Sequence, residues 1–254
     1  MNAIFRRRLL ERELLCGTML TTSSVEVTEI LAHLEYDWLF IDTEHSPLSP
    51  MTVRSLIQAA GKVPCLVRLA DRGEVSIKNA LDSGAAGIIA PQVNNAKEAK
   101  EIVSYCKYPP AGTRGVGLSR ASKYGLEFSD YVSNANNSIS VVLQIEHIEA
   151  VKNVHEILAV EGLDAIFIGP YDLSTSMGKP GLLRDPAVVE AINVVREACL
   201  EAKIALGYFG MDVNDVTERA VQGFSLLCSG LDLGFLTESG RKNLEGLKST
   251  KVVL

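Results

Sequence analysis

Two acidic side chains in the middle of the chain have the type and spacing of a metal site. Glu146 directly follows the apolar run Val141–Ile145, and Asp172 follows the run Ala165–Ile168 after a short turn. The helical pattern between the runs predicts a strand, a crossover helix and a parallel strand, which brings the carboxyl ends of both strands to one edge of a sheet. Neighbouring strands lie about 4.8 Å apart. Two carboxylates that close repel unless a proton or a cation lies between them, so we expect a divalent cation there.

Two protein carboxylates leave most positions of an octahedral ion to water and substrate oxygens. This chemistry suits Mg²⁺ or Mn²⁺, with Co²⁺ as a further candidate. The alternative is that Glu146 and Asp172 only cap the helices that follow them, because acidic side chains stabilise helix N-termini. Their occurrence together at adjacent strand ends, with Gln144 next to the first, favours the metal site.

Two further polar side chains follow predicted strands and could act on a bound organic acid. Arg68 ends the run Cys65–Arg68, where its guanidinium would face the same edge and suit a carboxylate or an enolate oxygen. The alternative for Arg68 is a structural ion pair with Asp42 or Glu44. His45 directly follows Glu44, and an imidazole near a carboxylate is a general-base arrangement.

The turn Gly169–Asp172 opens toward a polar segment, and backbone N–H groups at such a turn can hold a carboxylate. The glycine-containing loop Gly112–Arg120 does not run from a strand straight into a helix, so it is not a dinucleotide-binding fingerprint. No Lys lies within a predicted strand or at its carboxyl end, which disfavours a Schiff-base mechanism.

The elements that must position these residues alternate between strand and helix patterns. The expected strands are Leu14–Leu20, Trp38–Ile41, Cys65–Arg68, Gly87–Ala90, Val141–Ile145, Ala165–Ile168, Ile204–Leu206 and Ser225–Cys228. The expected helices are Ser24–Leu34, Pro50–Ala60, Glu74–Asp82, Ala96–Cys106, the crossover helix, Pro186–Ala202, Val213–Val221 and Leu231–Leu247, with a short extra helix at Phe128–Ala135. Eight such units in residues 1–254 favour a single α/β domain folded as a TIM (β/α)₈ barrel over a doubly wound sheet.

Composition excludes several classes of protein. A hydrophobic fraction of 47% and a charged fraction of 22% fit a soluble globular protein, and the net charge of -6 gives no reason to expect nucleic acid or a membrane as partner. No apolar run reaches the roughly 18 residues of a membrane span, and no signal-peptide pattern is found. The five cysteines form no CxxC pair, which argues for a reducing, cytoplasmic location. Cys16, Cys65 and Cys228 are expected to be small core residues.

Several motifs together resemble the HpcH/HpaI family of class II, metal-dependent pyruvate aldolases. These motifs are Asp37–His45, Val67–Arg68, Tyr108–Gly115, Gln144–Glu146 and Phe167–Leu173, and they span nearly the whole chain in family order. The resemblance implies a barrel whose last helix is exchanged between subunits of a homohexamer, a trimer of dimers. It also implies pyruvate and an aldehyde as the small-molecule partners.

The resemblance further implies a role for each matching residue. Glu146 and Asp172 would be the metal ligands, and Gln144 would contact pyruvate. The backbone amides of Tyr171 and Asp172 would hold the pyruvate carboxylate, and Arg68 would stabilise the enolate.

His45 would be the base, and Asp82 matches the acid credited with raising the basicity of that histidine. Asp82 ends a predicted helix at the far end of the barrel, so we expect it to serve a neighbouring subunit. Gln92 and Tyr171 stand at positions that vary or are usually smaller in the family, which bears on the choice of aldehyde.

The predicted reaction is the reversible cleavage of a 4-hydroxy-2-oxo acid, of the 2-keto-3-deoxy sugar acid type, to pyruvate and an aldehyde through a metal-bound pyruvate enolate. Oxaloacetate decarboxylation or citramalyl-type acyl-CoA lysis on the same centre are the alternatives. A CoA substrate would need a basic groove, for which only Arg114, Arg120 and Lys123 are candidates. A non-catalytic binding barrel is disfavoured by the intact set of candidate residues.

Overall fold

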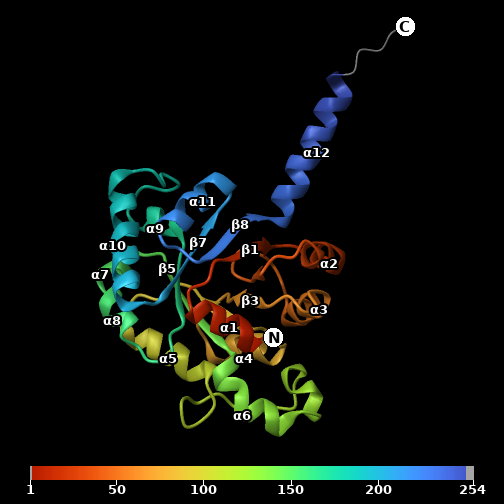
Figure 1. Ribbon diagram of the computed structural model, residues 1–254, viewed down its shortest axis with the longest axis vertical. Coiled ribbons are helices and arrows are strands. Elements are labelled where there is room, and N and C mark those ends of the chain that lie inside the picture. Colours follow the sequence, from red (N-terminus) through yellow and green to blue (C-terminus); the bar gives the residue numbers. More distant parts are fainter. Residues whose placement is uncertain (1, 250–254) are drawn as a thin grey trace.

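A closed barrel of eight parallel strands forms the centre of the molecule (Figure 1), as seen in a computed structural model that describes residues 2–249. The strands are β1 (Leu15–Leu20), β2 (Trp38–Asp42), β3 (Cys65–Arg68), β4 (Gly87–Ala90), β5 (Ser140–Ile145), β6 (Ala165–Ile168), β7 (Ala205–Gly210) and β8 (Leu226–Leu231). Each strand pairs with the next in the sequence, and β8 closes the ring on β1. The predicted barrel is therefore confirmed.

Helices surround this barrel. They are α1 (Asn2–Leu10), α2 (Val25–His33), α3 (Pro50–Ala59), α4 (Glu74–Asp82), α5 (Ala96–Cys106), η1 (Arg120–Gly125), α6 (Phe128–Ser138), α7 (Ile148–Lys152), α8 (Val154–Leu158), α9 (Pro170–Ser176), α10 (Pro186–Ala202), α11 (Val213–Val221) and α12 (Asp232–Ser249). The predicted crossover helix is split into α7 and α8 at Asn153, and the short helix α9 follows β6 directly. Within residues 2–249 no helix is long and apolar enough to cross a membrane.

Two strands extend further than the sequence pattern predicts. Expected at Ile204–Leu206 and Ser225–Cys228, they run on to Gly210 and Leu231. Glycines interrupt the apolar run in both places, yet backbone pairing between β7 and β8 continues to Gly210 and Ser229. The extension carries Phe209 and Leu231 to the carboxyl end of the barrel, where the cavity described below opens.

Aromatic rings fill the barrel interior. Trp38, Phe40 and Phe167 pack with ring centroids 5.6 to 6.2 Å apart, and all three are almost completely buried. Phe5 and Leu9 of α1 belong to the same buried cluster, so α1 contributes to the core inside the ring as well as to the outside of the molecule. This packed interior separates one end of the barrel from the other.

The last helix, α12, projects away from the barrel instead of lying on it (Figure 1). Its first residue, Asp232, is buried and accepts hydrogen bonds from the backbone and hydroxyl groups of Thr21 and Thr22, which follow β1. Burial alone would raise the pKa of Asp232, but these hydrogen bonds outweigh it and lower the pKa. Past this anchor the helix exposes apolar side chains at Leu233, Phe235, Leu236, Leu244 and Leu247.

One expectation about the cysteines is wrong. Cys65 and Cys228 are buried as predicted, but Cys16 is exposed. Its neighbours Leu15 and Gly17 are buried, and because side chains alternate along a strand, the Cys16 thiol points outward near the start of β1.

The close packing inside the barrel generates a stability prediction at Gly17. A Cβ atom there would lie 2.6 Å from Trp38 Cε2 and Nε1, and Trp38 cannot retreat because Phe40 and Phe167 pack against it. We expect Gly17→Ala to lower the free energy of unfolding by about 1–3 kcal/mol, measured by urea denaturation. Gly240→Ala, where an added Cβ meets no atom within 4 Å, is the control and should not destabilise the protein. Equal stability of the two variants would contradict this account of the core.

Candidate active site

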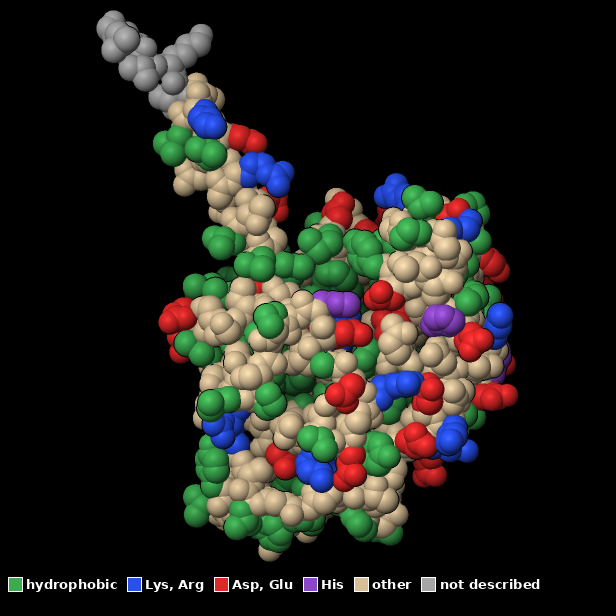
Figure 2. All heavy atoms as spheres, turned by 180° about the vertical axis from the view of Figure 1, so that it is seen from behind, with side chains coloured by type: hydrophobic (Ala, Val, Ile, Leu, Met, Phe, Trp, Pro, Cys, Tyr) green, Lys and Arg blue, Asp and Glu red, His purple; other side chains and the backbone are tan. Residues whose placement is uncertain are grey.

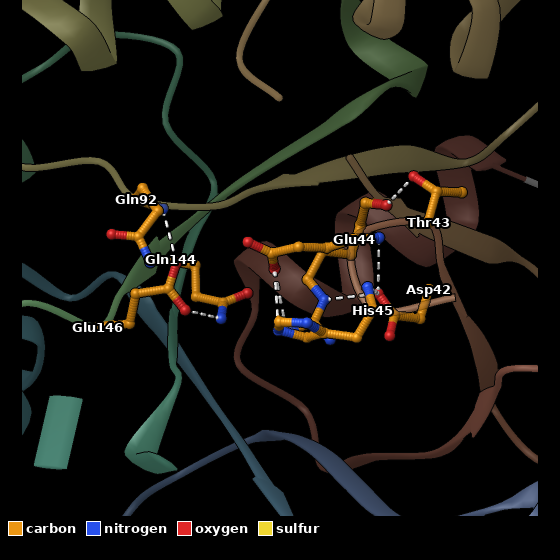
Figure 3. A network of polar contacts seen from close by, with 8 residues as sticks. Asp42, Thr43, Glu44, His45, Gln92, Gln144 and Glu146 are labelled. Carbon is orange, nitrogen blue, oxygen red and sulfur yellow. Dashed lines mark hydrogen bonds and ion pairs between the residues drawn. The ribbon is translucent and has the colours of Figure 1, made fainter. Parts of the chain in front are cut away.

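A cavity of about 620 Å³ opens at the carboxyl end of the barrel. Its walls include most of the residues singled out in the sequence: His45, Arg68, Gln144, Tyr171 and Asp172. They come from the turn after β2, from β3 and β5, and from the start of α9, segments that are far apart in the chain. Figure 3 shows two groups of polar residues facing each other, Gln92, Gln144 and Glu146 in one and the segment from Asp42 to His45 in the other.

Glu146 lies immediately beyond the end of β5 and is 1% exposed. Its Oε1 accepts a hydrogen bond of 2.6 Å from the backbone N–H of Gln92, and its Oε2 accepts one from the side-chain amide of Gln144. A Cβ atom at Gly169 would lie 2.7 Å from Oε2, so the carboxylate fits only because this position has no side chain. Since Gly169 caps α9 and Asp172 lies in its first turn, Glu146 packs against the helix end that carries the second acid.

The N–H group that holds Glu146 belongs to a residue in an unusual backbone conformation. Gln92 has a φ of 55°, in the left-handed region that residues other than glycine seldom adopt. Its carbonyl oxygen accepts hydrogen bonds from Arg72 Nη1 at 2.7 Å and Asn94 Nδ2 at 3.2 Å. These contacts stabilise the strained conformation and direct the N–H of Gln92 at Glu146. The sequence places Gln92 after a strand but does not reveal this role, because the contact is made by the backbone.

Asp42 organises the opposite side of the cavity. Its Oδ1 accepts hydrogen bonds from Arg68 Nε at 2.8 Å and from the backbone N–H groups of Glu44 and His45 at 3.0 and 3.4 Å. Arg68 Nη1 also lies 3.3 Å from Glu44 Oε2, and the guanidinium carbon lies 5.3 Å from the centroid of the Phe40 ring. Arg68 thus forms the ion pairs considered as its structural alternative and still lines the cavity.

Around Glu146 and Arg68, the acidic side chains outnumber the basic ones. Burial raises the pKa of Glu146 to about 7; the Gln92 N–H and Arg68 oppose the rise, and Glu44 and Asp172 add to it. Burial likewise raises the pKa of Glu44, against the opposing effects of Arg68 and His45. These carboxylates therefore repel one another, and the guanidinium near them, that of Arg68, already forms an ion pair with Asp42.

The donor atoms present fit an oxygen-preferring cation. The described residues contain no group of three or more His, Cys, Asp or Glu side chains that could hold a metal ion. The Gln144 amide binds the Glu146 carboxylate, and its Oε1 is buried without a hydrogen-bond partner. Asp172 lines the same cavity as Gln144 and acts electrostatically on Glu146. Such a set suits a divalent ion that keeps most of its ligands as water or substrate oxygens, and it would neutralise the surplus negative charge.

The two remaining candidates, His45 and Asp82, lie apart. The His45 side chain is 60% exposed at the cavity, and its Nε2 is 3.8 Å from Glu44 Oε2. Asp82 ends α4 at the opposite end of the barrel and pairs with Arg114, whose Nη2 lies 2.6 Å from Asp82 Oδ1. Arg114 itself is buried against the ring of Tyr108 at 4.7 Å. Within one chain the structure does not bring Asp82 to His45.

The sequence pattern did not predict the apolar part of the cavity wall. It is formed by Met19, Phe209, Leu231 and Leu233, from β1, β7, β8 and α12. The sequence pattern predicted that β7 and β8 end at Leu206 and Cys228, so Phe209 and Leu231 were not expected at the carboxyl ends of these strands. The signal that could have found them is the barrel itself, because every strand of a closed ring must reach the same end.

Comparisons with known proteins agree with this geometry. Residues 16–239 match the family model described as HpcH/HpaI aldolase/citrate lyase. The chain is 44% identical over 190 residues to 4-hydroxy-2-oxo-heptane-1,7-dioate aldolase of Shigella sonnei, covering 72% of each protein. It is 34% identical to 2-keto-3-deoxy-L-rhamnonate aldolase of Salmonella gallinarum, over all of this chain and 97% of that one. A crystal structure of an HpcH/HpaI aldolase/citrate lyase family protein from Burkholderia cenocepacia superposes with a TM-score of 0.94 at 32% identity, covering 98% of this chain and all of that chain.

The raised pKa of Glu146 generates a prediction about stability and pH. Because the folded protein binds this proton more tightly than the unfolded chain, unfolding releases it, and the chelator-treated protein should lose stability as the pH rises from about 4.5 to about 7. Each unit of the pKa difference corresponds to about 1.4 kcal/mol, so at pH 8 Glu146→Gln should be more stable than the wild type by a few kcal/mol. Urea denaturation across this pH range in EDTA measures the difference. Glu149→Gln, which alters an exposed acid on α7, is the control, and a stability gap for Glu146→Gln that does not change with pH would contradict the assignment.

Proposed function

The chain belongs to the HpcH/HpaI aldolase/citrate lyase family, and we propose that the cavity at its barrel mouth is the active site of a metal-dependent pyruvate aldolase. The enzyme is a carbon–carbon lyase that reversibly cleaves 4-hydroxy-2-oxo acids of the 2-keto-3-deoxy type to pyruvate and an aldehyde. The observation that supports the site assignment most is the approach of buried Glu146 to the helix end bearing Asp172, made possible by Gly169, beside a cavity lined by Asp172, Arg68 and His45.

Glu146 and Asp172 are the proposed metal ligands, with Gln144 beside them. Mg²⁺ or Mn²⁺ is the expected ion, and Co²⁺ is an alternative, since all three accept carboxylate and water oxygens. When bound, the divalent cation would polarise the 2-oxo group and stabilise the negative charge of the pyruvate enolate. The surplus negative charge around Glu146 supports this proposal.

The protein itself would hold the pyruvate half of the substrate. Tyr171 and Asp172 lie in the first turn of α9, where backbone N–H groups have no acceptor within the helix, and they are placed to bind the substrate carboxylate. Gln144 would contact the same half through its amide. Arg68, fixed by Asp42, would face the 2-oxo oxygen and stabilise the charge that develops there as the enolate forms.

His45 is the proposed base, because its side chain is accessible and lies near Glu44. In cleavage, Nε2 takes the proton of the 4-hydroxyl group, directly or through a water molecule. The electrons of that O–H bond then form the aldehyde carbonyl, the C3–C4 bond breaks, and its electron pair passes to the enolate. Protonation of the enolate at C3 yields pyruvate, and aldol addition is the reverse sequence.

Assembly completes this proposal. Beyond its first turn, α12 projects from the barrel and exposes the apolar side chains of Leu236, Leu244 and Leu247, which supports exchange of this helix between subunits of a homohexamer arranged as a trimer of dimers. In such an assembly Asp82 would reach the His45 of a neighbouring copy and raise its basicity. Arg114, held between Tyr108 and Tyr131, would fix the position of Asp82.

Removing either proposed ligand tests the metal site. We expect Glu146→Ala and Asp172→Ala to lose about a thousandfold or more of the Mg²⁺- or Mn²⁺-supported kcat for pyruvate release, because neither variant retains a complete site. Pyruvate release from a panel of 4-hydroxy-2-oxo acids and from oxaloacetate, with and without EDTA, is the measurement. Glu149→Ala is the matched control. Metal-dependent turnover in either ligand variant would remove that residue from the site, and turnover of oxaloacetate alone would make the enzyme a decarboxylase.

Mixed assemblies test the role of Asp82. We expect His45→Ala and Asp82→Ala each to lose most activity, and their co-expression to restore up to about a quarter of it, since some sites then combine an intact His45 with an intact Asp82 from another chain. Steady-state aldol cleavage by the purified mixture gives the answer. Co-expression of His45→Ala with Arg68→Ala should restore nothing, because one chain supplies both groups to a cavity. Full activity of Asp82→Ala by itself would exclude a role for that acid.

A further inference from the structure

The charged and amide residues of the cavity and the apolar residues Met19, Phe209 and Leu231 occupy different arcs of the barrel ring. Asp42, Arg68 and Gln144 come from the ends of β2, β3 and β5, whereas Met19, Phe209 and Leu231 come from β1, β7 and β8. The buried side chains of Phe40, Phe167 and Ile168, from β2 and β6, also line the cavity. In the closed order β1 to β8, the strands β7, β8 and β1 are consecutive and stand across the ring from β3, β4 and β5. The cavity therefore has a charged side and a facing apolar side.

The apolar side reaches the molecular surface. Leu233 at the base of α12 is 48% exposed and Tyr171 at the start of α9 is 41% exposed, and both line the cavity. Figure 2 shows hydrophobic side chains gathered on the surface where the projecting α12 leaves the barrel. Large apolar side chains exposed at the mouth of a polar site are suited to bind an apolar part of a ligand.

Within residues 2–249, no unpaired Arg or Lys side chain lines the apolar side of the cavity to bind an anion. Among the described residues lining the cavity, Arg68 is the one Arg or Lys, and it belongs to the facing side, paired with Asp42 and Glu44. The charged group next to Leu231 and Leu233 in the sequence is the carboxylate of Asp232. A carboxylate or phosphate in this half of the cavity would find acids and no free cation.

Hydrogen-bonding groups are also scarce on this side. Thr21, which lines the cavity directly after β1, already donates its hydroxyl proton to Asp232 Oδ1 at 2.6 Å. A sugar-like tail with several hydroxyl groups would lose its bonds to water here and gain few in exchange, which disfavours its binding.

We propose that the aldehyde handled by this enzyme is uncharged and carries a short alkyl tail, which lies against Met19, Phe209, Leu231 and Leu233. This inference rests on the proposed pyruvate aldolase function and specifies its second substrate. The pyruvate half occupies the charged side, and the C4 substituent of the cleaved acid extends toward β7, β8 and β1. Tyr171 lies where the two halves meet, since its backbone belongs to the proposed carboxylate site and its ring to the apolar side.

Three aldehydes of similar length test the proposal in the synthetic direction. Butanal, succinic semialdehyde and glyceraldehyde differ in ending with a methyl, a carboxylate or a hydroxyl group. With pyruvate, Mg²⁺ and the full-length enzyme, we expect kcat/KM for butanal to exceed both others by about tenfold or more. Equal or better use of succinic semialdehyde or glyceraldehyde would overturn the proposal.

A second measurement tests the proposed aldolase function separately from the proposed alkyl aldehyde. Exchange of the pyruvate methyl protons with deuterium in D₂O, followed by NMR, reports enolate formation without any aldehyde. Metal-dependent exchange together with a preference for a charged or polar aldehyde would overturn the alkyl tail and leave the aldolase intact. Absence of both exchange and aldol addition would overturn the two together.

A charge placed in the apolar side gives a test that needs no absolute rate. Leu233→Lys puts a cation at an exposed position that should tolerate it, and we expect the ratio of kcat/KM for succinic semialdehyde to that for butanal to rise about tenfold or more. Val221→Lys, an exposed position on α11 outside the cavity, should keep the wild-type ratio. An unchanged ratio in Leu233→Lys would show that the aldehyde tail does not lie where we propose.

Discussion

A buried carboxylate held within electrostatic reach of two others is the constraint on which the rest of this structure depends. Glu146 is almost fully enclosed, within electrostatic reach of Glu44 and Asp172, and its raised pKa expresses the resulting cost. An isolated carboxylate would relieve such a cost by protonation or by moving into water. Here movement is prevented, since the carboxylate is held by two hydrogen bonds and by contact with Gly169. The electrostatic energy retained in this way favours binding of a divalent cation.

Backbone groups supply much of the restraint, and the closed barrel holds those groups in place. The N–H of Gln92 reaches Glu146 only because Gln92 adopts a left-handed conformation, which Arg72 and Asn94 stabilise through its carbonyl oxygen. On the other side, Asp42 binds Arg68 and also the backbone of the turn that carries His45. Residues that touch no substrate therefore fix those proposed to do so, which is how a rigid scaffold makes a precise site.

Sequence reasoning reached those parts of the structure that depend on side-chain pattern and failed for those that depend on backbone. The strand, crossover and strand around Glu146 and Asp172 were predictable because apolar runs with polar ends mark buried parallel strands, and that unit implies where both acids lie. The ends of β7 and β8 could not be predicted in this way. In β7, for example, Gly207 and Gly210 interrupt the apolar run, although the hydrogen-bonded pairing of β7 with β8 continues. The role of Gln92 was equally hidden, since any residue has an N–H. The exposure of Cys16 was also not predicted, because it depends on the position of this residue near the start of β1, which composition does not reveal.

The division of the cavity into a charged and an apolar side has a consequence for assembly. Leu231 and Leu233 flank Asp232, the buried anchor that binds Thr21 and Thr22 at the point where α12 leaves the barrel. The apolar side is thus built partly from the segment that sets the direction of α12, the helix proposed to be exchanged between subunits. On the charged side, the contacts that hold Glu146 and Arg68 all come from the same chain, and in the proposed assembly only His45 would meet a residue of another copy, Asp82. A change in subunit packing would therefore act first on the aldehyde half of the site and on His45, while the pyruvate half, fixed by Asp42, Gln92 and Gly169, would keep its geometry.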